Sequence, residues 1–276
     1  MASETYTHGH PASVLRSHRW RTAENSAAYL LPRLRPGLDV LDVGCGPGTI
    51  TLDLARIVGA GHAVGVDGAA AAVEAAKESA AAAGADISFA VDDAYRLSFD
   101  DDRFDVVHAH QVLQHLADPV AALREMGRVC RPGGTVAVRD ADYAAMSWWP
   151  LDPRLDRWLE LYRVAARANG GEPDAGRRLI AWARSAGFVD VIPSASVWCF
   201  AQREDRAWWS ETWAERSTDS PLSRQLVDSD LATQVELDEI GKAWHEWAED
   251  PDGWFAVVHG EVLATMPDHR TGDRSH

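Results

Sequence analysis

The sequence predicts a doubly wound, mostly parallel α/β fold with an antiparallel pair of strands at its edge and helical lid elements. From Asp39 onward, short runs of β-branched residues alternate with longer helical stretches, a pattern typical of βαβ units around a parallel sheet. The first of these strands runs directly into a glycine-rich turn followed by a helix. Near the C-terminus, strand-like alternation returns after a tryptophan-rich helical stretch, which favours two further strands at the sheet edge.

The first half of the chain contains the strands expected to be parallel, at residues 39–43, 63–67, 87–91, 104–109 and 135–139. The helices between them are expected to begin near Thr49, Ala70 and Pro119. The third helix is expected to end at Arg131-Pro132-Gly133-Gly134, because proline cannot continue a helix and glycine tolerates a positive φ.

The second half of the chain is predicted to be mainly helical. Residues 148–153 are expected to form a loop, and helices are expected at 155–169 and 174–186. The segment 204–249 is predicted to be a helical insertion between strands at 189–200 and 254–266. These two strands are expected to pair antiparallel.

Composition and charge exclude several classes of protein. The chain has 276 residues, of which 46% are hydrophobic, and a formal net charge of −15, so a sizeable core can form and nucleic acid is an unexpected partner. Its three cysteines form no C-x-x-C pair, so neither a disulfide framework nor a metal site is expected. No apolar run reaches the roughly 20 residues that span a bilayer, and the N-terminus does not resemble a secretory signal. The expectation is a cytoplasmic protein without stable membrane insertion that acts on small molecules.

The most specific segment is the glycine turn after the first strand. Gly44, Gly46 and Gly48 alternate in VLDVGCGPGT, and glycines at such a turn let the backbone approach a ligand closely. The dinucleotide fingerprint G-x-G-x-x-G has a different spacing. Asp42, two residues before the first glycine, would repel a pyrophosphate and would suit a cation, which argues against a nicotinamide oxidoreductase.

Carboxylates follow the next two strands. Asp67 ends the second strand, where an acidic residue can accept hydrogen bonds from both ribose hydroxyls. Asp93 follows the third strand and can accept from an exocyclic adenine amine. Together these residues suit an adenosine ligand without phosphates; the alternative interpretation is a tight turn with ordinary loop acids.

Four segments of the chain belong together: VLDVGCGPGTITLDLA, VGVDG, VDDAYRLSFDDDRFDVVHAHQVLQHL and RPGGTVAV. In order and spacing they resemble the motifs of the class I S-adenosylmethionine-dependent methyltransferases, most of all the ubiquinone/menaquinone-biosynthesis type and its natural-product relatives. The resemblance implies a Rossmann-like fold with S-adenosylmethionine as cofactor. It places the glycine turn at the methionine moiety, Asp67 at the ribose, Asp93 at the adenine, and His110 and Gln111 beside the methionine amino group and the methyl. The cofactor site is thus expected to include Asp42, Gly44, Cys45, Gly46, Asp67, Gly68, Asp93, Ala94, His110 and Gln111.

On this interpretation residues 1–276 form a single methyltransferase domain. The core at 36–145 binds the cofactor, and residues 1–35 contribute an N-terminal lid helix. The segments 146–170 and 204–250 form a helical cap over the substrate, and the edge strands lie at 187–200 and 253–266.

The expected reaction is direct in-line methyl transfer to a small, aromatic or apolar acceptor, for which positioning is the main requirement. Where a base is needed, His110 and His115 are the candidates; the alternative for His115 is a structural role. In the N-terminal segment, Arg16 or Arg21 can pair with the cofactor carboxylate or can lie on a surface helix face.

Tryptophan is unusually frequent, and all but Trp20 of the twelve lie at or beyond Trp148. Tyr143, Trp148 and Trp149 follow the fifth strand and are expected to form a wall of the acceptor site, since pockets in such sheets open beyond the carboxyl ends of strands. The helical pairs Trp209/Trp213 and Trp244/Trp247 are expected to be core, because each pair shares one helix face. Alternatives to a small-molecule enzyme are a regulatory protein that binds the cofactor without catalysis and a methyltransferase acting on a peptide.

Overall fold

A mixed eight-stranded sheet organises the protein, and the computed structural model describes residues 20–265 and 267. The strand order is β3-β2-β1-β4-β5-β8-β6, and β7 pairs with the other edge of β8. The parallel strands are β1 (Val40–Val43), β2 (Ala63–Asp67), β3 (Ser88–Val91), β4 (Phe104–His110) and β5 (Cys130–Ala141). The antiparallel strands are β6 (Ser147–Trp149), β7 (Val189–Phe200) and β8 (Trp254–Thr265). The predicted fold class, including the antiparallel edge pair, is confirmed.

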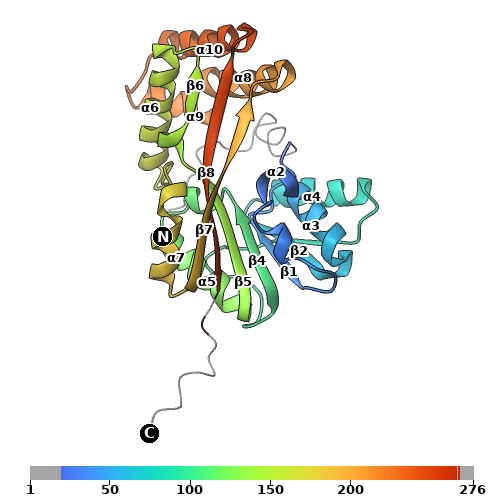
Figure 1. The fold of residues 1–276 in the computed structure, drawn as a ribbon. Helices are drawn as coiled ribbons and strands as arrows, with labels where there is room; N and C mark the ends of the chain where they lie inside the picture. Colours follow the sequence, from blue (N-terminus) through green and yellow to red (C-terminus); the bar gives the residue numbers. More distant parts are fainter. Residues whose placement is uncertain (1–19, 266, 268–276) are drawn as a thin grey trace.

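Helices cover both faces of the parallel part of the sheet (Figure 1). These helices are α2 (Ala23–Ser26), α3 (Thr49–Val58), α4 (Ala70–Ala82), α5 (Pro119–Val129) and α7 (Leu179–Ala186). The neighbouring residues Val106 and Val107 of β4 point to opposite faces, as successive strand residues must. Val106 packs in the cluster that contains α3, whereas Val107 packs in the cluster that contains α5 and α7. The sheet is therefore buried between two helical layers, which explains the continuous apolar runs in its strands.

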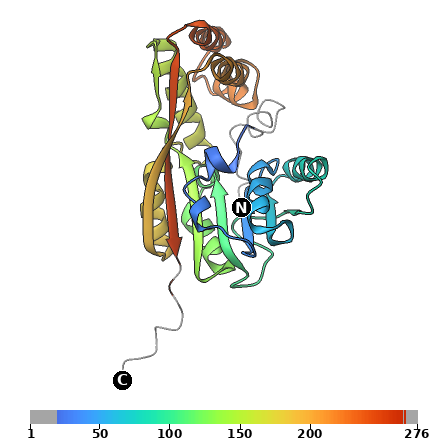
Figure 2. The ribbon, with the colours of Figure 1, turned by 45° about the vertical axis from the view of Figure 1, so that its right-hand side comes forward.

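The remaining helices form a cap at one end of the sheet. They are α6 (Pro153–Ala168), α8 (Arg203–Thr218), α9 (Pro221–Asp228) and α10 (Gln234–Glu249). Strands β7 and β8 run from the core into this cap, where β6 joins β8 (Figures 1 and 2). Side chains from α6, α8 and α10 share one hydrophobic cluster with Phe255 of β8. The cap is thus built on the same strands that extend the core sheet.

Two expectations about local structure are wrong. Residues 148–153 do not begin as a loop, because β6 pairs Trp148 with Phe255 of β8. The helix after Pro119 ends at Val129 and not at the Pro-Gly-Gly segment, which belongs to the start of β5. Capping explains the helix start, since the Asp118 side chain accepts a hydrogen bond from the backbone N–H of Ala121.

The N-terminal segment is described only from Trp20 onward. In this part the expected lid helix is replaced by the single helical turn α2 and a 3₁₀ turn at Leu31–Arg33. Arg16 lies outside the described residues. Among the described helices, none is long and apolar enough to cross a membrane.

Candidate functional site

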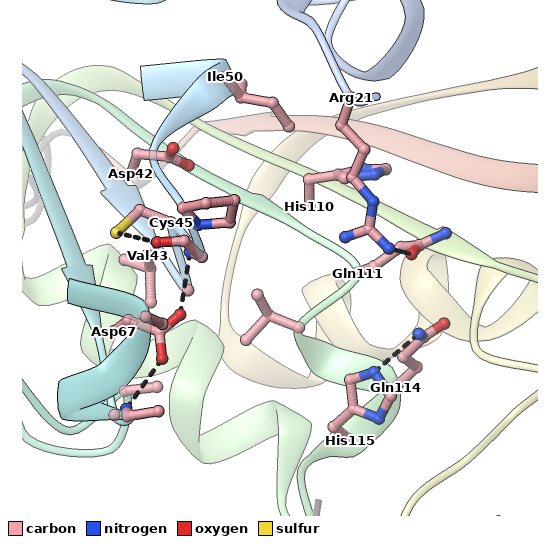
Figure 3. A pocket seen from close by; sticks show the side chains of 18 of the residues that line it. Arg21, Asp42, Val43, Cys45, Ile50, Asp67, His110, Gln111, Gln114 and His115 are labelled. Atoms are coloured by element: carbon pink, nitrogen blue, oxygen red, sulfur yellow. Dashed lines mark hydrogen bonds between the residues drawn. The ribbon is translucent and has the colours of Figure 1, made fainter. Parts of the chain in front are cut away.

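A cavity of about 770 Å³ lies where the core meets the cap, at the carboxyl ends of β1, β2 and β4. Its walls come from the glycine turn, the loops after β2, β3 and β4, and the inner face of α8; Figure 3 shows part of this lining. Core and cap therefore enclose one continuous space. This position follows from the topology, because ligands of open α/β sheets bind beyond the carboxyl ends of the strands.

The glycine turn forms one wall of this cavity. The backbone N–H groups of Gly44 and Cys45 donate to the Val66 carbonyl at 2.7 and 2.9 Å, which ties the turn to β2. Gly44 has a φ of +70°, and a Cβ at this position would lie 2.3 Å from Cγ2 of Val112. Glycine is therefore required both for the backbone conformation and for the close approach of the loop after β4. Burial raises the pKa of the Cys45 thiol, so this group remains protonated.

Asp67 is held at the cavity wall by two backbone groups. Its Oδ2 accepts a hydrogen bond from the N–H of Gly46 at 3.0 Å, and its Oδ1 accepts from the N–H of Ala69 at 2.9 Å (Figure 3). Each carboxylate oxygen can accept a further hydrogen bond. The carboxylate is thus pre-positioned to receive two more donors, as the hydroxyl pair of a ribose offers.

The loop after β3 supplies a second acidic corner. The carboxylate of Asp92 accepts from the N–H and hydroxyl of Ser98 and so stabilises the loop. The neighbouring Asp93 accepts from the N–H of Tyr95 at 2.9 Å, and both aspartates line the cavity together with Ala94. Both aspartates therefore shape the loop, and both lie beside the space for a ligand.

Asp42 lines the same cavity but has little exposed surface. Its carboxylate accepts from the Thr51 hydroxyl at 2.5 Å and from Nδ1 of His108 at 2.8 Å. The side chain is almost fully buried. These contacts link β1, α3 and β4 directly behind the glycine turn.

Gln111 connects the N-terminal segment to β8. Its backbone has a φ of +55°, an uncommon value for a residue other than glycine, and its N–H donates to the carbonyl of Arg139 at 2.7 Å. The side-chain oxygen accepts from Nη2 of Arg21 at 2.6 Å (Figure 3). Its amide nitrogen donates to Nε2 of His259 at 2.8 Å, since Nδ1 of that histidine must donate to the Val257 carbonyl. The amide is thereby fixed in one orientation at the cavity wall.

His110 is a buried, neutral histidine at the end of β4. Burial lowers its pKa well below the usual value, and the positive charge of Arg139 lowers the pKa further. Nη1 of that arginine lies 3.4 Å from Nδ1, so Nδ1 is the acceptor and the ring proton resides on Nε2. Nε2 is buried and finds no hydrogen-bond partner among the described residues. His110 therefore presents an N–H donor and is a weak base.

His115 also lines the cavity and is also neutral. Burial lowers its pKa to about 3, and the positive charges of Arg21 and Arg216 lower it in the same direction. Its Nε2 lies 2.9 Å from Nε2 of Gln114 (Figure 3). A base with so low a pKa provides little driving force for proton abstraction near neutral pH.

A buried polar cluster around Arg139, which sequence reasoning missed, lies beside His110 and Gln111. Arg139 of β5 donates from Nε to the Ser196 hydroxyl at 3.0 Å and to Glu261 at 3.2 Å. Its guanidinium carbon lies 4.9 Å from the ring centre of Trp198. The participants come from β5, β7 and β8, so no local motif joins them. The available signal was the presence of charged residues inside two largely apolar strand patterns, Arg139 and Asp140 in β5 and Glu261 in β8.

The wall on the side of the cap is aromatic. The residues that line the cavity there come from β5, the segment after it, α8 and β8; they are Ala141, Tyr143, Met146, Trp208, Trp209, Trp213, Arg216 and Val257. Tyr143 stacks on Tyr162 at 4.2 Å, and Trp209 stacks on Phe200 at 4.2 Å. These side chains are thus held in place by aromatic partners in the core of the cap.

The expectation that Trp148 and Trp149 form this wall is wrong. Trp148 points into the core of the cap and stacks on Phe255 at 5.5 Å. Trp149 is 55% exposed, and its carbonyl accepts from Nε1 of Trp247. The cause is the strand conformation of β6, which sends successive side chains to opposite faces and neither of these two to the cavity. Tyr143 does line the cavity.

Comparison with known proteins identifies relatives over almost the whole length. A family model described as a methyltransferase domain matches residues 34–204. An uncharacterized methyltransferase of Schizosaccharomyces pombe is 35% identical, over 94% of this chain and 95% of its own length. A probable methyltransferase of Aspergillus luteorubrus is 30% identical, over 95% and 97% of the two chains. A demethylmenaquinone methyltransferase of Roseiflexus castenholzii is 38% identical, over 56% of this chain and 63% of its own.

Solved structures share the fold. The YcgJ protein of Bacillus subtilis superimposes with a TM-score of 0.58 at 20% identity, over 87% of this chain and 97% of that one. A phosphoethanolamine N-methyltransferase of Haemonchus contortus, solved with phosphomonomethylethanolamine and S-adenosylhomocysteine, gives a TM-score of 0.53 at 18% identity. That match covers 87% of this chain and 52% of the Haemonchus protein.

Proposed function

The chain belongs to the S-adenosylmethionine-dependent methyltransferases, and from this membership we propose that its cavity binds the cofactor at the glycine turn and a small aromatic or apolar acceptor under the cap. The core at 36–145 would then bind the cofactor, and the segments 146–170 and 204–250 would cover the acceptor. The observation that carries the proposal is that one cavity is lined by carboxylates from the core and by tryptophans from the cap.

The residues present fit the cofactor. Asp67 keeps an acceptor position on each oxygen for the two ribose hydroxyls, and Asp93 with Ala94 lies where the adenine would be read. Gly44, Cys45 and Gly46 offer backbone surface to the methionine moiety. The site also includes Gly68. A Cβ at this position would have the carbonyl oxygen of Asp92 as its nearest neighbour, at 3.8 Å, so the space beside Gly68 is open.

We assign the charged end of the methionine moiety to the loop after β4. Gln111 lies at the cavity wall with its amide fixed between Arg21 and His259. The guanidinium of Arg21 suits the cofactor carboxylate because it can bind a carboxylate with two parallel hydrogen bonds. This assignment favours the cofactor role of Arg21 over a surface position.

When bound, the cofactor would supply a methyl group that is already activated on a sulfonium. The protein must then orient the acceptor and exclude water. The aromatic wall of Tyr143, Trp209 and Trp213 would orient the acceptor and would also exclude water. His110 and His115 are neutral, so we propose that they position ligands by hydrogen bonding and do not act as strong bases.

An aromatic acceptor is supported by the aromatic side chains of the cap wall and by one relative. The relative from Roseiflexus castenholzii is named for demethylmenaquinone, an aromatic compound. Flat aromatic acceptors stack favourably on tryptophan, by roughly 0.5 to 1.5 kcal/mol beyond the burial of their area.

The direct test combines binding with turnover. Calorimetry should show binding of S-adenosylhomocysteine, and labelled S-adenosylmethionine should then be incubated with a panel of phenols, hydroquinones, aliphatic amines and short peptides. We expect label on the aromatic compounds. Cofactor binding without any transfer would favour a regulatory protein, and transfer to peptides alone would favour a peptide methyltransferase.

A further inference from the structure

The N-terminal segment, in the part that the structure describes, packs against the aromatic side of the cap. Its residue Trp20 lies among side chains of β7 and α8. The ring centre of Trp20 is 5.1 Å from that of Trp198, 5.3 Å from that of Phe200 and 5.4 Å from that of Trp208. The ring planes of Trp20 and Trp208 are inclined by only 24°, so these two rings stack. Trp20 therefore extends the core of the cap with a side chain from the other end of the sequence.

The contacts that follow Trp20 in the chain fix its position. Its carbonyl accepts a hydrogen bond from Nδ2 of Asn25 at 3.0 Å, and the carbonyl of Asn25 accepts from Nε1 of Trp198 at 2.6 Å. The next residue, Arg21, donates to the side chain of Gln111 at 2.6 Å, and its guanidinium carbon lies 5.7 Å from the ring centre of Trp198. The segment is thus attached both to β7 and to the loop after β4.

Trp208 is the tryptophan of the cavity wall whose orientation depends on this contact. It is half-buried, whereas Trp209 and Trp213 are 6% and 1% exposed. Phe200 and Trp209 also contact Trp208, but their rings are tilted by 41° and 42°, so Trp20 is its one stacked partner among the described aromatic side chains. A half-buried indole that loses such a partner can turn to another staggered rotamer.

Trp20 acts on the cavity from behind. It is not among the described residues that line the cavity, whereas Trp208 is. Both residues also lie outside residues 34–204, the part of the chain that the methyltransferase model matches. The contact therefore joins two segments that flank the shared domain, and it lies on the side of the cavity where we place the acceptor.

We propose that Trp20 is a positioning residue for the acceptor: it holds the ring plane of Trp208 at the cavity wall, so that the site selects flat acceptors over puckered ones of the same skeleton. This inference rests on the proposed function and adds a determinant of its acceptor specificity. A wall with a fixed plane stacks on a flat ring and leaves less width for a saturated one. A Trp208 ring that could turn would adapt to either shape.

The first test uses the unmodified protein saturated with S-adenosylhomocysteine and measures binding by calorimetry. The probes are 2-naphthol and decahydro-2-naphthol, which share one carbon skeleton and one hydroxyl group and differ in planarity. We expect 2-naphthol to bind more tightly by a factor of about 3 to 10, the gain that stacking on tryptophan provides. Equal affinities, or tighter binding of the saturated probe, would overturn the inference.

The second test assigns this preference to Trp20. In Trp20→Ala the ratio of the two affinities should fall by a factor of about 2 to 5, and Trp20→Phe should retain an intermediate ratio. Trp208→Ala should lower the ratio as well, and the double variant should lower it no further, because Trp20 acts through Trp208. Since each ratio is measured within one variant, partial loss of folded protein does not affect it.

The matched control is Trp149→Ala, which removes a tryptophan that is 55% exposed and should preserve the ratio. A ratio unchanged in both Trp20 variants would refute the inference, and so would a further fall in the double variant.

Failure of the inference can be distinguished from failure of the proposed function. Trp20→Ala should bind S-adenosylhomocysteine nearly as the unmodified protein does. A loss of cofactor affinity as large as the loss of naphthol affinity would mean that Trp20 supports the whole site, which would overturn the positioning role. If both probes bind and the ratio ignores Trp20, only the present inference fails. If S-adenosylhomocysteine binds but neither probe does, the aromatic acceptor of the proposed function fails and the inference fails with it.

Discussion

Replacing Asp67 tests the cofactor site most directly. In Asp67→Ala, the ribose would lose the carboxylate that we propose as its acceptor, while the N–H groups of Gly46 and Ala69 lose the partners that they have at 3.0 and 2.9 Å. A hydrogen bond to a charged group contributes about 1.5 to 3 kcal/mol. In the variant, water can take the place of the lost carboxylate in this half-buried site. We therefore count the free energy of only one such hydrogen bond for the two ribose hydroxyls together. The affinity for S-adenosylhomocysteine should then fall by a factor of about 10 to 150.

The affinity of Asp67→Asn for S-adenosylhomocysteine should be closer to that of Asp67→Ala than to that of the unmodified protein. The native carboxylate accepts from a different backbone N–H on each oxygen, so an amide would turn its NH₂ group toward one of these donors. Glu74→Gln, on the exposed face of α4, is the control for the loss of one negative charge and should leave the affinity unchanged.

A ligand change separates the ribose contact from the effect on the glycine turn. Calorimetry should compare S-adenosylhomocysteine with its 2′-deoxy analogue in the unmodified protein and in Asp67→Ala. The unmodified protein should discriminate between the two ligands, and the variant should not, because the acceptor for the missing hydroxyl is already gone. Undiminished affinity for S-adenosylhomocysteine in a folded Asp67→Ala protein would refute the reasoning, as would equal discrimination in both proteins.

Three further predictions follow from the geometry. Gly44→Ala should lower stability by about 1 to 3 kcal/mol and weaken S-adenosylhomocysteine binding, because residue 44 has a φ of +70° and its Cβ would overlap Val112. Denaturation measures the first effect and calorimetry the second. A variant of native stability would contradict the packing argument. Trp149→Ala should change ligand binding less than twofold, because this side chain is largely exposed to solvent. Trp209→Ala should weaken the binding of aromatic probes and cost about 3 to 5 kcal/mol of stability. A selective loss of probe binding in Trp149→Ala would reverse the assignment of the wall. Burial raises the pKa of Asp140 to about 7, so the folded state holds a proton that the unfolded state releases near pH 4. The free energy of unfolding should therefore fall as the pH rises from about 4 to 7. In urea titrations Asp140→Asn should flatten this slope, and a slope unaffected by the substitution would exclude Asp140 as its source.

The parallel core could be predicted because its signals are local. The central strand β1 is a short apolar run buried throughout, and the helices begin where expected, at Thr49, Ala70 and Pro119. The strand pair at the edge was also predictable, because the segments that form β7 and β8 are strand-like in composition over twelve residues each. These patterns depend on residues close together in the sequence.

The cap could not be predicted to the same extent, because its geometry depends on distant contacts. Strand β6 has only three residues, and its partner β8 follows more than a hundred residues later, so residues 148–153 carried no strand signal. The face of α8 that meets the cavity is decided by the docking of α6 and α10, which no spacing within α8 reveals. For this reason the spacing of Trp209 and Trp213 predicted core packing but not their second role at the cavity.

This double role determines where acceptor specificity can change. Trp213 is almost fully buried and meets Trp158 at 4.5 Å, so its replacement would open a void inside the cap as well as alter the pocket. Trp208 also lines the cavity but is only partly buried, and it stacks on Trp20 of the N-terminal segment at 5.4 Å. Substitution of Trp208 would therefore reshape the proposed acceptor site at a smaller cost in stability. Specificity within this fold is accordingly expected to vary at the half-buried Trp208, while the deeper tryptophans preserve the cap.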